Sequence, residues 1–346
     1  MFKGIVAFSA LCALSALVVG CGDNGKNHGG ASKTSSVVVV YVSEDQVFSE
    51  PILKDFEKET GITVKAVYDT EETKSTGAMN RLIAEKGNPQ ADVYWANEPI
   101  RAEVLKRKGV SEPYISPNSK GIPAEFKDPE GYWTGFSARA RVFVVAAGVK
   151  DKPKGISAYT DPRWKARSAI ANPLFGTTTS EIAALFEVWG DDKAKKFMVD
   201  MKANGVRITT DNGESADAVA SGRADFSLVD SDDAINRIRQ GKKLDLVYPD
   251  QGEDGLGTFI VPNAVVLIKD APRPETARKL IDYLLSKETE LKLADAGCAQ
   301  IPLHPEVEGP PELKPIDKIK AMRVDYAEVA DKMVEIQPFL KNWLGL

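Results

Sequence analysis

The sequence predicts an α/β protein built from two lobes, with a ligand-binding cleft between them. Strand and helix patterns alternate in a first series over residues 37–108 and in a second series over residues 168–240. Two long extended stretches, at residues 134–147 and 259–269, lie before and after the second series. Alternating strands and helices are typical of parallel sheets covered by helices. Two extended stretches between two such sheets favour a hinge of two strands.

The first series begins with a continuous apolar run at residues 37–43, which is typical of a parallel strand buried on both faces. The next segment places Ile52, Leu53 and Phe56 on one helical face, with Gly61 as the stop. The remaining elements are strands at 62–68 and 91–95 and helices at 48–60, 75–86 and 99–108. This order predicts a parallel sheet with right-handed crossovers.

The second series repeats the α/β pattern after the first extended stretch. Its expected elements are strands at 168–171 and 225–229 and helices at 179–189, 192–204, 216–221 and 232–240. The second extended stretch is interrupted at Pro262 and Asn263. The end of the chain is predicted to be helical at 274–286, 288–296 and 316–344. Because ligands of open α/β sheets lie at the carboxyl ends of the strands, the cleft between the two lobes is the expected binding site.

The first residues of the chain have the pattern of a secretory signal. A basic Lys3 precedes an apolar run, and small residues lead to Gly20 and Cys21. The run is shorter than the roughly 20 residues of a membrane span, which disfavours a transmembrane anchor. Its Gly–Cys ending resembles a bacterial lipoprotein signal, which implies that Cys21 is acylated and becomes the mature N-terminus. The protein is therefore expected on the periplasmic or cell-surface side, anchored to the membrane through this lipid alone.

These patterns divide the chain into four parts. The boundaries are 1–20 for the signal peptide, 21–36 for a lipid-anchored flexible linker, 37–136 plus 263–305 for the first lobe, and 137–262 plus 306–346 for the second lobe with the C-terminal helices. The linker assignment depends on its Gly, Asn, Ser and Lys content.

Composition excludes several classes of function. The 346 residues are 43% hydrophobic, and the net charge of −5 comes with no basic block, so nucleic acid is not an expected partner. The two histidines, His28 and His304, give no zinc motif, and no glycine-rich phosphate loop is present. Cys298 would be the one cysteine left beyond the lipidation site, and we expect it to be a small buried apolar residue. No cofactor, resident metal or catalytic residue is predicted.

Several motifs together resemble a known family. They are Tyr41–Asp45, Phe56–Ile62, Ala91–Trp95, Ser137–Val142, Asp161–Lys165, Thr258–Val266 and Ile301–Leu303. In order and spacing they are similar to the periplasmic substrate-binding proteins of ATP-driven (ABC) importers, in the branch of the ferric-ion-binding proteins. The resemblance implies a type II periplasmic-binding-protein fold with a two-strand hinge and an interlobe cleft. It also implies a monomeric, non-enzymatic binding protein that delivers its ligand to an inner-membrane permease.

The same resemblance bears on the metal. Ferric-binding members hold iron with adjacent tyrosines after a strand of the second lobe, and Asp232 and Asp233 stand at those positions here. The family's iron-binding His matches Asp45, and its Glu matches Asn97 or the adjacent Glu98. The usual iron ligands are therefore replaced, although carboxylates also bind hard cations.

Candidate ligand contacts in the second lobe lie on a turn, a strand and a helix start. In the family the turn that matches residues 172–180 holds an anion, and free N–H groups with hydroxyls make such a site physically reasonable. Ordinary helix capping is the alternative. Arg139 and Arg141 alternate on an extended stretch, so both should point to one face, as anion ligands or as interlobe salt bridges. The second-lobe candidates are Gly176, Thr177, Thr178, Arg139, Asp232 and Asp233.

First-lobe candidates follow the carboxyl ends of the predicted strands. They are Ser43, Glu44, Thr76, Trp95 and Asn97. Trp95 would cover an apolar part of the ligand, or else pack in the core.

Together these features predict a lipid-anchored solute-binding protein that captures a small anionic or zwitterionic ligand. An aminoalkylphosphonate or a phosphorylated small molecule fits the mixture of arginines and carboxylates. The alternatives are a ferric iron-binding protein of an iron(III) importer, an extracellular hydrolase that uses two carboxylates, and a sensor subunit. Turnover of a bound ligand would separate the hydrolase from the binding proteins.

Overall fold

The computed structural model describes residues 36–69 and 76–346. Cys21, the predicted signal peptide and most of the predicted linker lie outside the described residues. So does the segment 70–75, and the boundaries of the four predicted parts remain predictions. Within the described part, no helix combines the length and apolar content that a membrane crossing requires.

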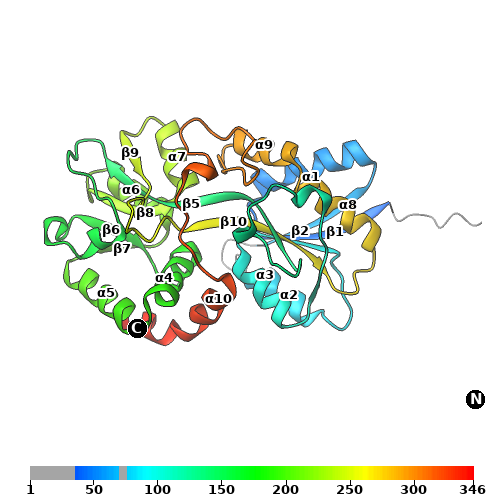
Figure 1. The fold of residues 1–346 in the computed structure, drawn as a ribbon, viewed down its shortest axis with the longest axis horizontal. Helices are drawn as coiled ribbons and strands as arrows, with labels where there is room; N and C mark the ends of the chain where they lie inside the picture. Colours follow the sequence, from blue (N-terminus) through cyan, green and yellow to red (C-terminus); the bar gives the residue numbers. More distant parts are fainter. Residues whose placement is uncertain (1–35, 70–75) are drawn as a thin grey trace, which may run out of the picture. The chain divides into compact units, whose positions relative to one another are not determined.

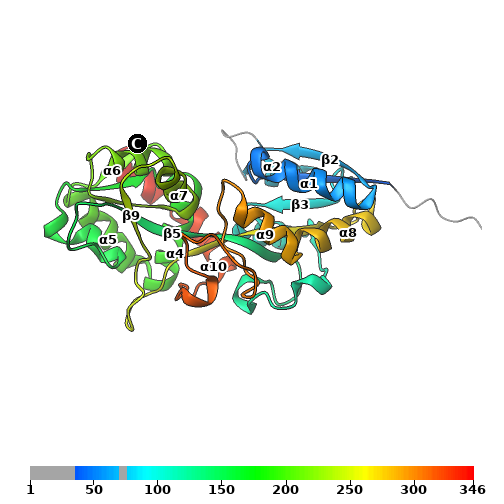
Figure 2. The ribbon, with the colours of Figure 1, turned by 90° about the horizontal axis from the view of Figure 1, so that it is seen from above.

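The first lobe is built on a sheet with the strand order β2-β1-β3-β10-β5. Its strands are β1 (Val37–Val42), β2 (Thr63–Tyr68), β3 (Val93–Ala96), the short β4 (Ser111–Glu112) and β10 (Ile260–Ile268). β1 pairs in parallel with β2 and β3, as predicted, whereas β10 runs antiparallel to β3. The helices are α1 (Gln46–Thr60), α2 (Thr76–Ala84), α3 (Pro99–Arg107), α8 (Pro274–Leu284) and α9 (Lys287–Asp295). Figure 2 shows α8 and α9 beside α1, on one face of this sheet.

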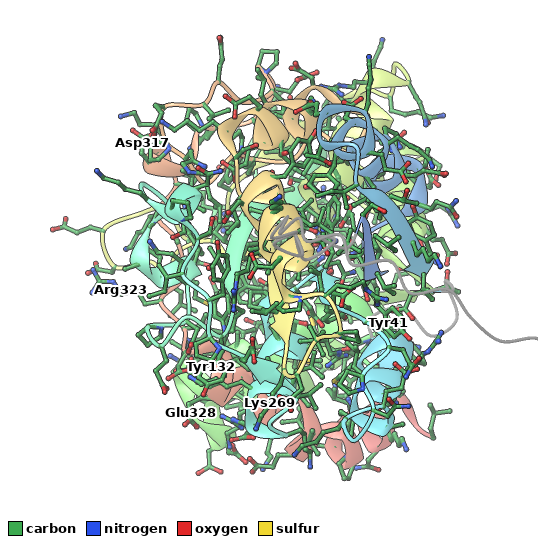
Figure 3. All side chains as sticks on the ribbon, turned by 90° about the vertical axis from the view of Figure 1, so that its right-hand side faces the viewer. Tyr41, Tyr132, Lys269, Asp317, Arg323 and Glu328 are labelled. Carbon is green, nitrogen blue, oxygen red and sulfur yellow. The ribbon has the colours of Figure 1, made fainter. Side chains whose placement is uncertain are left out.

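β1 is buried on both faces, which explains its continuous apolar sequence. Val40 packs in a cluster with Phe56 of α1. Tyr41, labelled in Figure 3, belongs to the core cluster on the opposite face. The guanidinium of Arg81 in α2 lies 4.6 Å from the centroid of the Tyr41 ring. The Tyr41 hydroxyl donates to the carboxylate of Glu85, 2.9 Å away.

The second lobe is built on a sheet with the strand order β5-β8-β6-β7, and β9 also pairs with β5. The strands are β5 (Thr134–Ala146), β6 (Ser168–Ala171), β7 (Arg207–Thr209), β8 (Phe226–Asp230) and β9 (Leu244–Val247). The helices are α4 (Gly176–Trp189), α5 (Asp191–Ala203), α6 (Asn212–Ala220) and α7 (Ser231–Arg239). β6, β7 and β8 are parallel, and β5 and β9 are antiparallel to each other.

β5 and β10 connect the two lobes (Figure 1). β5 pairs with β10 up to Ala140 and with β8 from Arg141 onward. The register of β5 with β10 shifts between Pro262 and Asn263. Facing this shift, Ser137 has a φ of +39°, in the left-handed region that non-glycine residues rarely adopt. These two strands are the hinge expected from the sequence.

The C-terminal segment forms two helices, α10 (Tyr326–Glu335) and α11 (Gln337–Leu344), after a short 3₁₀ turn at Ile316–Lys318. The predicted continuous helical character of 316–344 is therefore wrong for residues 319–325. This stretch is extended because Met322 N donates to Thr258 O, and Thr258 N donates to Lys320 O, both at 2.8 Å. α10 contacts α3 of the first lobe and α4 of the second.

Candidate functional site

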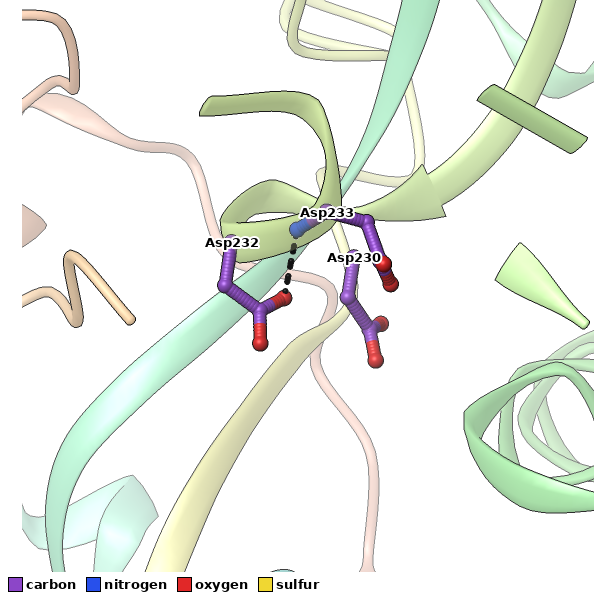
Figure 4. A group of neighbouring side chains, drawn as sticks. All are labelled: Asp230, Asp232 and Asp233. Atoms are coloured by element: carbon purple, nitrogen blue, oxygen red, sulfur yellow. Dashed lines mark hydrogen bonds between the residues drawn. The ribbon is translucent and has the colours of Figure 1, made fainter. Parts of the chain in front are cut away.

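Three carboxylates gather where β8 passes into α7. Asp230 ends the strand, and Asp232 and Asp233 occupy the first turn of the helix, where acidic residues interact favourably with the helix dipole. One oxygen from each of the three side chains lies within 4.8 Å of the others. Figure 4 shows the group, with the backbone N–H of Asp233 donating to Asp232 Oδ1 at 3.0 Å. The arrangement concentrates negative charge at the carboxyl end of β8.

Asp230 is neutralised within the second lobe. It lies directly opposite Arg141 in the β5–β8 ladder, and Arg141 Nη1 donates to Asp230 Oδ1 at 2.9 Å. The hydroxyl of Thr177 donates to Asp230 Oδ2 at 2.9 Å. Arg139 Nη1 lies 3.7 Å from the same oxygen. A buried carboxylate with these partners is well compensated.

Arg141 is fully buried, and every part of its guanidinium has a partner in the second lobe. Nε donates to Glu181 at 2.8 Å, Nη1 also approaches Asn212 at 3.1 Å, and Nη2 donates to Thr178 Oγ1 at 3.2 Å. These contacts with α4 and α6 place the guanidinium of Arg141, which extends from β5, in the interior of the second lobe, in an ion pair within that lobe.

The turn expected to hold an anion is organised around Arg141. Gly176 starts α4 with a φ of +60° and is exposed. Thr177 and Thr178 are buried, and their hydroxyl groups contact Arg141, Asp230 and Asn212 within the second lobe. The two hydroxyls thus stabilise the lobe rather than point at an open site. Their assignment as ligand contacts finds no support in this geometry.

Arg139 lies at the junction of the two lobes. Its Nη2 donates to the backbone carbonyl of Asn97, which follows β3 in the first lobe. Burial acts to lower the pKa of Arg139, but the negative charges around it outweigh burial and raise the pKa. The carboxylates responsible come from both lobes: Asp230, Glu44, Asp232 and Glu98. Glu98 also accepts a hydrogen bond from Ser180 Oγ of α4 at 2.7 Å, a second contact between the lobes.

Asp232 and Asp233 are less well compensated than Asp230. Burial raises the pKa of Asp232 to about 6, with a further contribution from Asp230 and an opposing one from Arg139. The pKa of Asp233 is raised well above its usual value by burial and then by the charges of Asp232 and Asp230. Arg237 Nη1, 3.4 Å from Asp233 Oδ1, opposes this rise only in part. Both side chains are half-buried. Their ionised forms would gain stability from a cation placed beside them.

The first-lobe candidates have different environments. Ser43 is buried, and its hydroxyl donates to Asp69 at 2.7 Å and contacts the Tyr94 hydroxyl at 2.8 Å. Glu44 is 7% exposed and accepts a hydrogen bond from Gln300. Ser43 therefore ties together the ends of β1, β2 and β3, whereas Glu44 belongs to the charged group around Arg139.

Trp95 and Thr76 do not join this group. Trp95 is completely buried, its ring centroid lies 5.4 Å from that of Phe136, and its indole N–H donates to Asn263. The structure thus places Trp95 in the core, the alternative left open by the sequence. Thr76 is exposed at the start of α2, and its hydroxyl lies 3.5 Å from Arg101 Nη2.

Two site residues were missed or undervalued in the sequence. Glu98 contributes a buried carboxylate from the first lobe, and Gln300 supports Glu44. The position of Glu98 just before Pro99, at the end of a predicted strand, was a usable signal for Glu98. Nothing in the local pattern distinguishes Gln300 from a surface glutamine. A cavity of about 420 Å³ on the second lobe, beside Trp164 and Arg167, includes none of the site residues.

A sequence model of the family described as bacterial extracellular solute-binding protein matches residues 52–321. Iron uptake protein A1 of Synechocystis sp. is 28% identical over 287 residues, which cover 78% of each chain.

Solved structures show the same architecture. The Trichodesmium protein IdiA (FutA), in complex with iron and citrate ligands, superposes with a TM-score of 0.78 at 23% identity and covers 89% of this chain and 99% of its own. AfuA of Actinobacillus pleuropneumoniae, with bound fructose-6-phosphate, gives a TM-score of 0.74 at 25% identity and covers 89% and 98%. These similarities confirm the two-lobed type II fold.

Proposed function

Because this chain belongs to the bacterial extracellular solute-binding protein family, we propose that it captures ferric iron at the junction of its lobes for an ABC importer. The observation that carries the proposal is the group of four carboxylates, drawn from both lobes, that surrounds Arg139. Asp232 and Asp233 are half-buried, have raised pKa values and lie beside Asp230. A cation bound among them would relieve this repulsion.

The donor set agrees with a hard cation. Carboxylate oxygens are preferred by hard, highly charged ions. Asp232 and Asp233 would supply ligands from the second lobe, and Glu44 and Glu98 lie on the first-lobe side of Arg139. Contacts from both lobes would favour the closed form by shifting its population. Arg139 would hold an anion, such as citrate, that accompanies the metal.

Iron as the cargo is also supported by the comparisons. The Synechocystis relative is named an iron uptake protein, and the Trichodesmium structure is described with iron and citrate. This chain would differ in holding iron through aspartates where the family has tyrosines. Its iron complex would therefore lack the visible charge-transfer band of a tyrosinate.

Acylation at Cys21 would keep the protein at the membrane surface beside its permease. The segment that carries this proposal lies outside the described residues. Mass spectrometry of the mature N-terminus tests it, because an unmodified Cys21 would contradict it.

A zwitterionic or phosphorylated organic ligand is the second candidate. It is favoured by the pairing of Arg139 with Asp232, since a guanidinium suits a phosphonate or phosphate and a carboxylate suits an ammonium or hydroxyl. The similarity to a fructose-6-phosphate-bound protein agrees with it. The two candidates share the same junction and differ in whether the carboxylates meet a metal.

Calorimetric titration of the ligand-stripped protein separates the candidates. The titrants are ferric citrate, citrate alone, 2-aminoethylphosphonate and fructose-6-phosphate. We expect ferric citrate to bind, and Asp232→Asn to weaken this binding by at least tenfold, or about 1.4 kcal/mol. The matched control is Asp254→Asn, an exposed aspartate of the second lobe. Binding of the organic ligands without ferric citrate would contradict iron, and chemical conversion of a bound ligand would point to a hydrolase.

A further inference from the structure

A chain of buried amide side chains runs from the hinge to the carboxylates of the junction. We propose that Asn263 and Gln300 are positioning residues that couple the conformation of the hinge to the carboxylate of Glu44. The proposal deepens the proposed function and rests on it in one respect, the role of Glu44 beside the cargo. Its structural part concerns described residues alone.

The direction of every hydrogen bond in this chain is fixed by Trp95. An indole N–H can only donate, so the Asn263 atom that it meets at 3.1 Å is Oδ1. Asn263 Nδ2 must then donate, and it does so to Ser137 O at 2.7 Å and to Gln300 Oε1 at 2.9 Å. Gln300 Nε2 in turn donates to Glu44 Oε1 at 3.1 Å. The side-chain orientations of Asn263 and Gln300 follow from these constraints.

Burial makes this chain rigid. Trp95, Asn263 and Gln300 are each 0% exposed. A buried amide that loses a partner is left with an unpaired polar group. Such a group lowers the stability of the folded state more than an unpaired group that is exposed to water. The chain therefore resists rearrangement of any single member and transmits displacement from one member to the next.

One end of the chain holds the hinge. Asn263 stands at the register shift between β5 and β10, opposite Ser137 with its φ of +39°. Both backbone groups of Ser137 are held by buried side chains, its carbonyl by Asn263 and its N–H by Glu290 Oε1 at 2.7 Å. A non-glycine residue in this region persists only when its surroundings hold it. Rotation about the hinge would change these contacts first.

The other end of the chain meets the charged junction. Glu44 is one of the four carboxylates whose charge raises the pKa of Arg139. The hydrogen bond from Gln300 fixes the direction of its carboxylate. Movement of the hinge would thus displace the carboxylate that faces a cation, and a cation bound at Glu44 would alter the hinge by the same coupling.

We call this coupling between Asn263, Gln300 and Glu44 the relay. A double-mutant cycle on the full-length protein tests the relay without any ligand. The variants are Glu44→Gln and Asn263→Ala, whose side chains are linked through Gln300. We expect their effects on the unfolding equilibrium constant to be non-additive by at least about fivefold. The control pairs Glu44→Gln with Ser227→Ala, which removes a buried hydrogen bond to Ala169 O elsewhere in the second lobe, and should be additive within about twofold. Additivity in the test cycle would overturn the relay.

Trp95→Phe provides a second cycle with Glu44→Gln, because it removes the donor that fixes the chain and keeps an aromatic ring. If Asn263→Ala does not fold, this second cycle still tests the relay, because additivity in it would contradict the relay. The functional readout is the radius of gyration by X-ray scattering with saturating ferric citrate. Gln300→Met should lose at least half of the ligand-induced compaction, whereas Ser227→Ala should keep it.

The outcomes separate the two proposals. If the wild-type protein does not bind ferric citrate but the double-mutant cycle is non-additive, ferric iron is excluded as the cargo and the relay is supported. If the protein binds ferric citrate but the cycle is additive, or if Gln300→Met shows full compaction, the relay is excluded and ferric iron is supported as the cargo.

Discussion

Arg139 and Arg141 lie two residues apart on β5, and their surroundings differ in almost every respect. Arg141 meets Asp230 and Glu181 at 2.9 and 2.8 Å, inside one lobe. Among the described residues, the ion pair that Arg139 makes is longer, with 3.7 Å between its Nη1 and Asp230 Oδ2. Arg139 is nevertheless surrounded by acidic side chains from both lobes.

The difference separates a structural ion pair from a binding site. Around Arg141, charges and hydrogen bonds are matched within the protein, which is what a buried ion pair requires. Around Arg139, carboxylates from both lobes gather, and burial raises the pKa values of Asp232 and Asp233. Perturbed pKa values of this kind gather at functional sites. We therefore propose that Arg139 serves binding and that Arg141 serves stability.

Replacement of Arg141 should produce the largest effect on stability. Arg141→Met would leave the buried carboxylates of Asp230 and Glu181 without their cation, and breaking such a pair costs about 3–5 kcal/mol. Arg139→Met should cost less than half of that, because Asp232, with a pKa of about 6, can take up a proton instead. Denaturant unfolding of both variants measures the contrast. Equal losses would show that the two sites do not differ as described.

Asp232→Asn should stabilise the empty protein while weakening cargo binding. The pKa of Asp232 is raised from 3.8 to about 6, so the folded state holds a proton that the unfolded state releases between these values. Wild-type stability should therefore fall as the pH rises from about 4 to 6, and the penalty stays in place above pH 6. The variant should be more stable by on the order of 1 kcal/mol at pH 7. A destabilised variant with the same pH profile would contradict the unbalanced charge at this site.

The sequence was sufficient for most of the fold because its strongest signals are local. The apolar run of β1 and Gly61, which ends α1 at a φ of +70°, identify their elements without knowledge of neighbours. β7, with three residues, and β9, with four, were missed because such short strands are specified by pairing with β6 and β5.

The candidate site was harder to predict for a related reason. Alternation correctly placed Arg139 and Arg141 on one face of β5, and both approach Asp230. It did not reveal that β5 changes partner between them, from β10 to β8, which puts one arginine at the junction and the other inside a lobe. The contact of Thr178 with Arg141 was not predicted for the same reason, because Arg141 lies on a strand that is distant from Thr178 in the sequence.

The His304–Glu290 pair extends the comparison to a matched ion pair in the first lobe. His304 Nδ1 lies 2.8 Å from Glu290 Oε2, and Nε2 lies 3.0 Å from Asn118 O, so both ring nitrogens face acceptors and the imidazolium is favoured. Burial acts to lower the pKa of His304, but the hydrogen bond with Glu290 outweighs it and raises the pKa above 6.5.

The His304–Glu290 pair should make the stability of the protein depend on pH. The stability from this pair is fully present below pH 6.5 and is lost as the pH rises through the higher folded-state pKa. We expect wild-type stability to fall above pH 6.5 by about 1–2 kcal/mol, a typical value for a charged hydrogen bond. His304→Gln should remove this slope and leave the slope between pH 4 and 6 unchanged. A slope that persists in the variant would assign it to another group.

Thr178→Val tests whether the turn at α4 contacts the structural arginine Arg141 or the ligand. Thr178→Val removes the hydroxyl that accepts from Arg141 at 3.2 Å and keeps the shape of the side chain. A lost hydrogen bond to a charged group costs about 1.5 kcal/mol. We expect this loss in denaturant unfolding, with affinity for ferric citrate unchanged within about twofold. The reverse result, intact stability with affinity lowered tenfold, would restore the turn as an anion site. In that case the second lobe would offer its ligand a hydroxyl as well as carboxylates, and the contrast between the two arginines would no longer divide stability from binding.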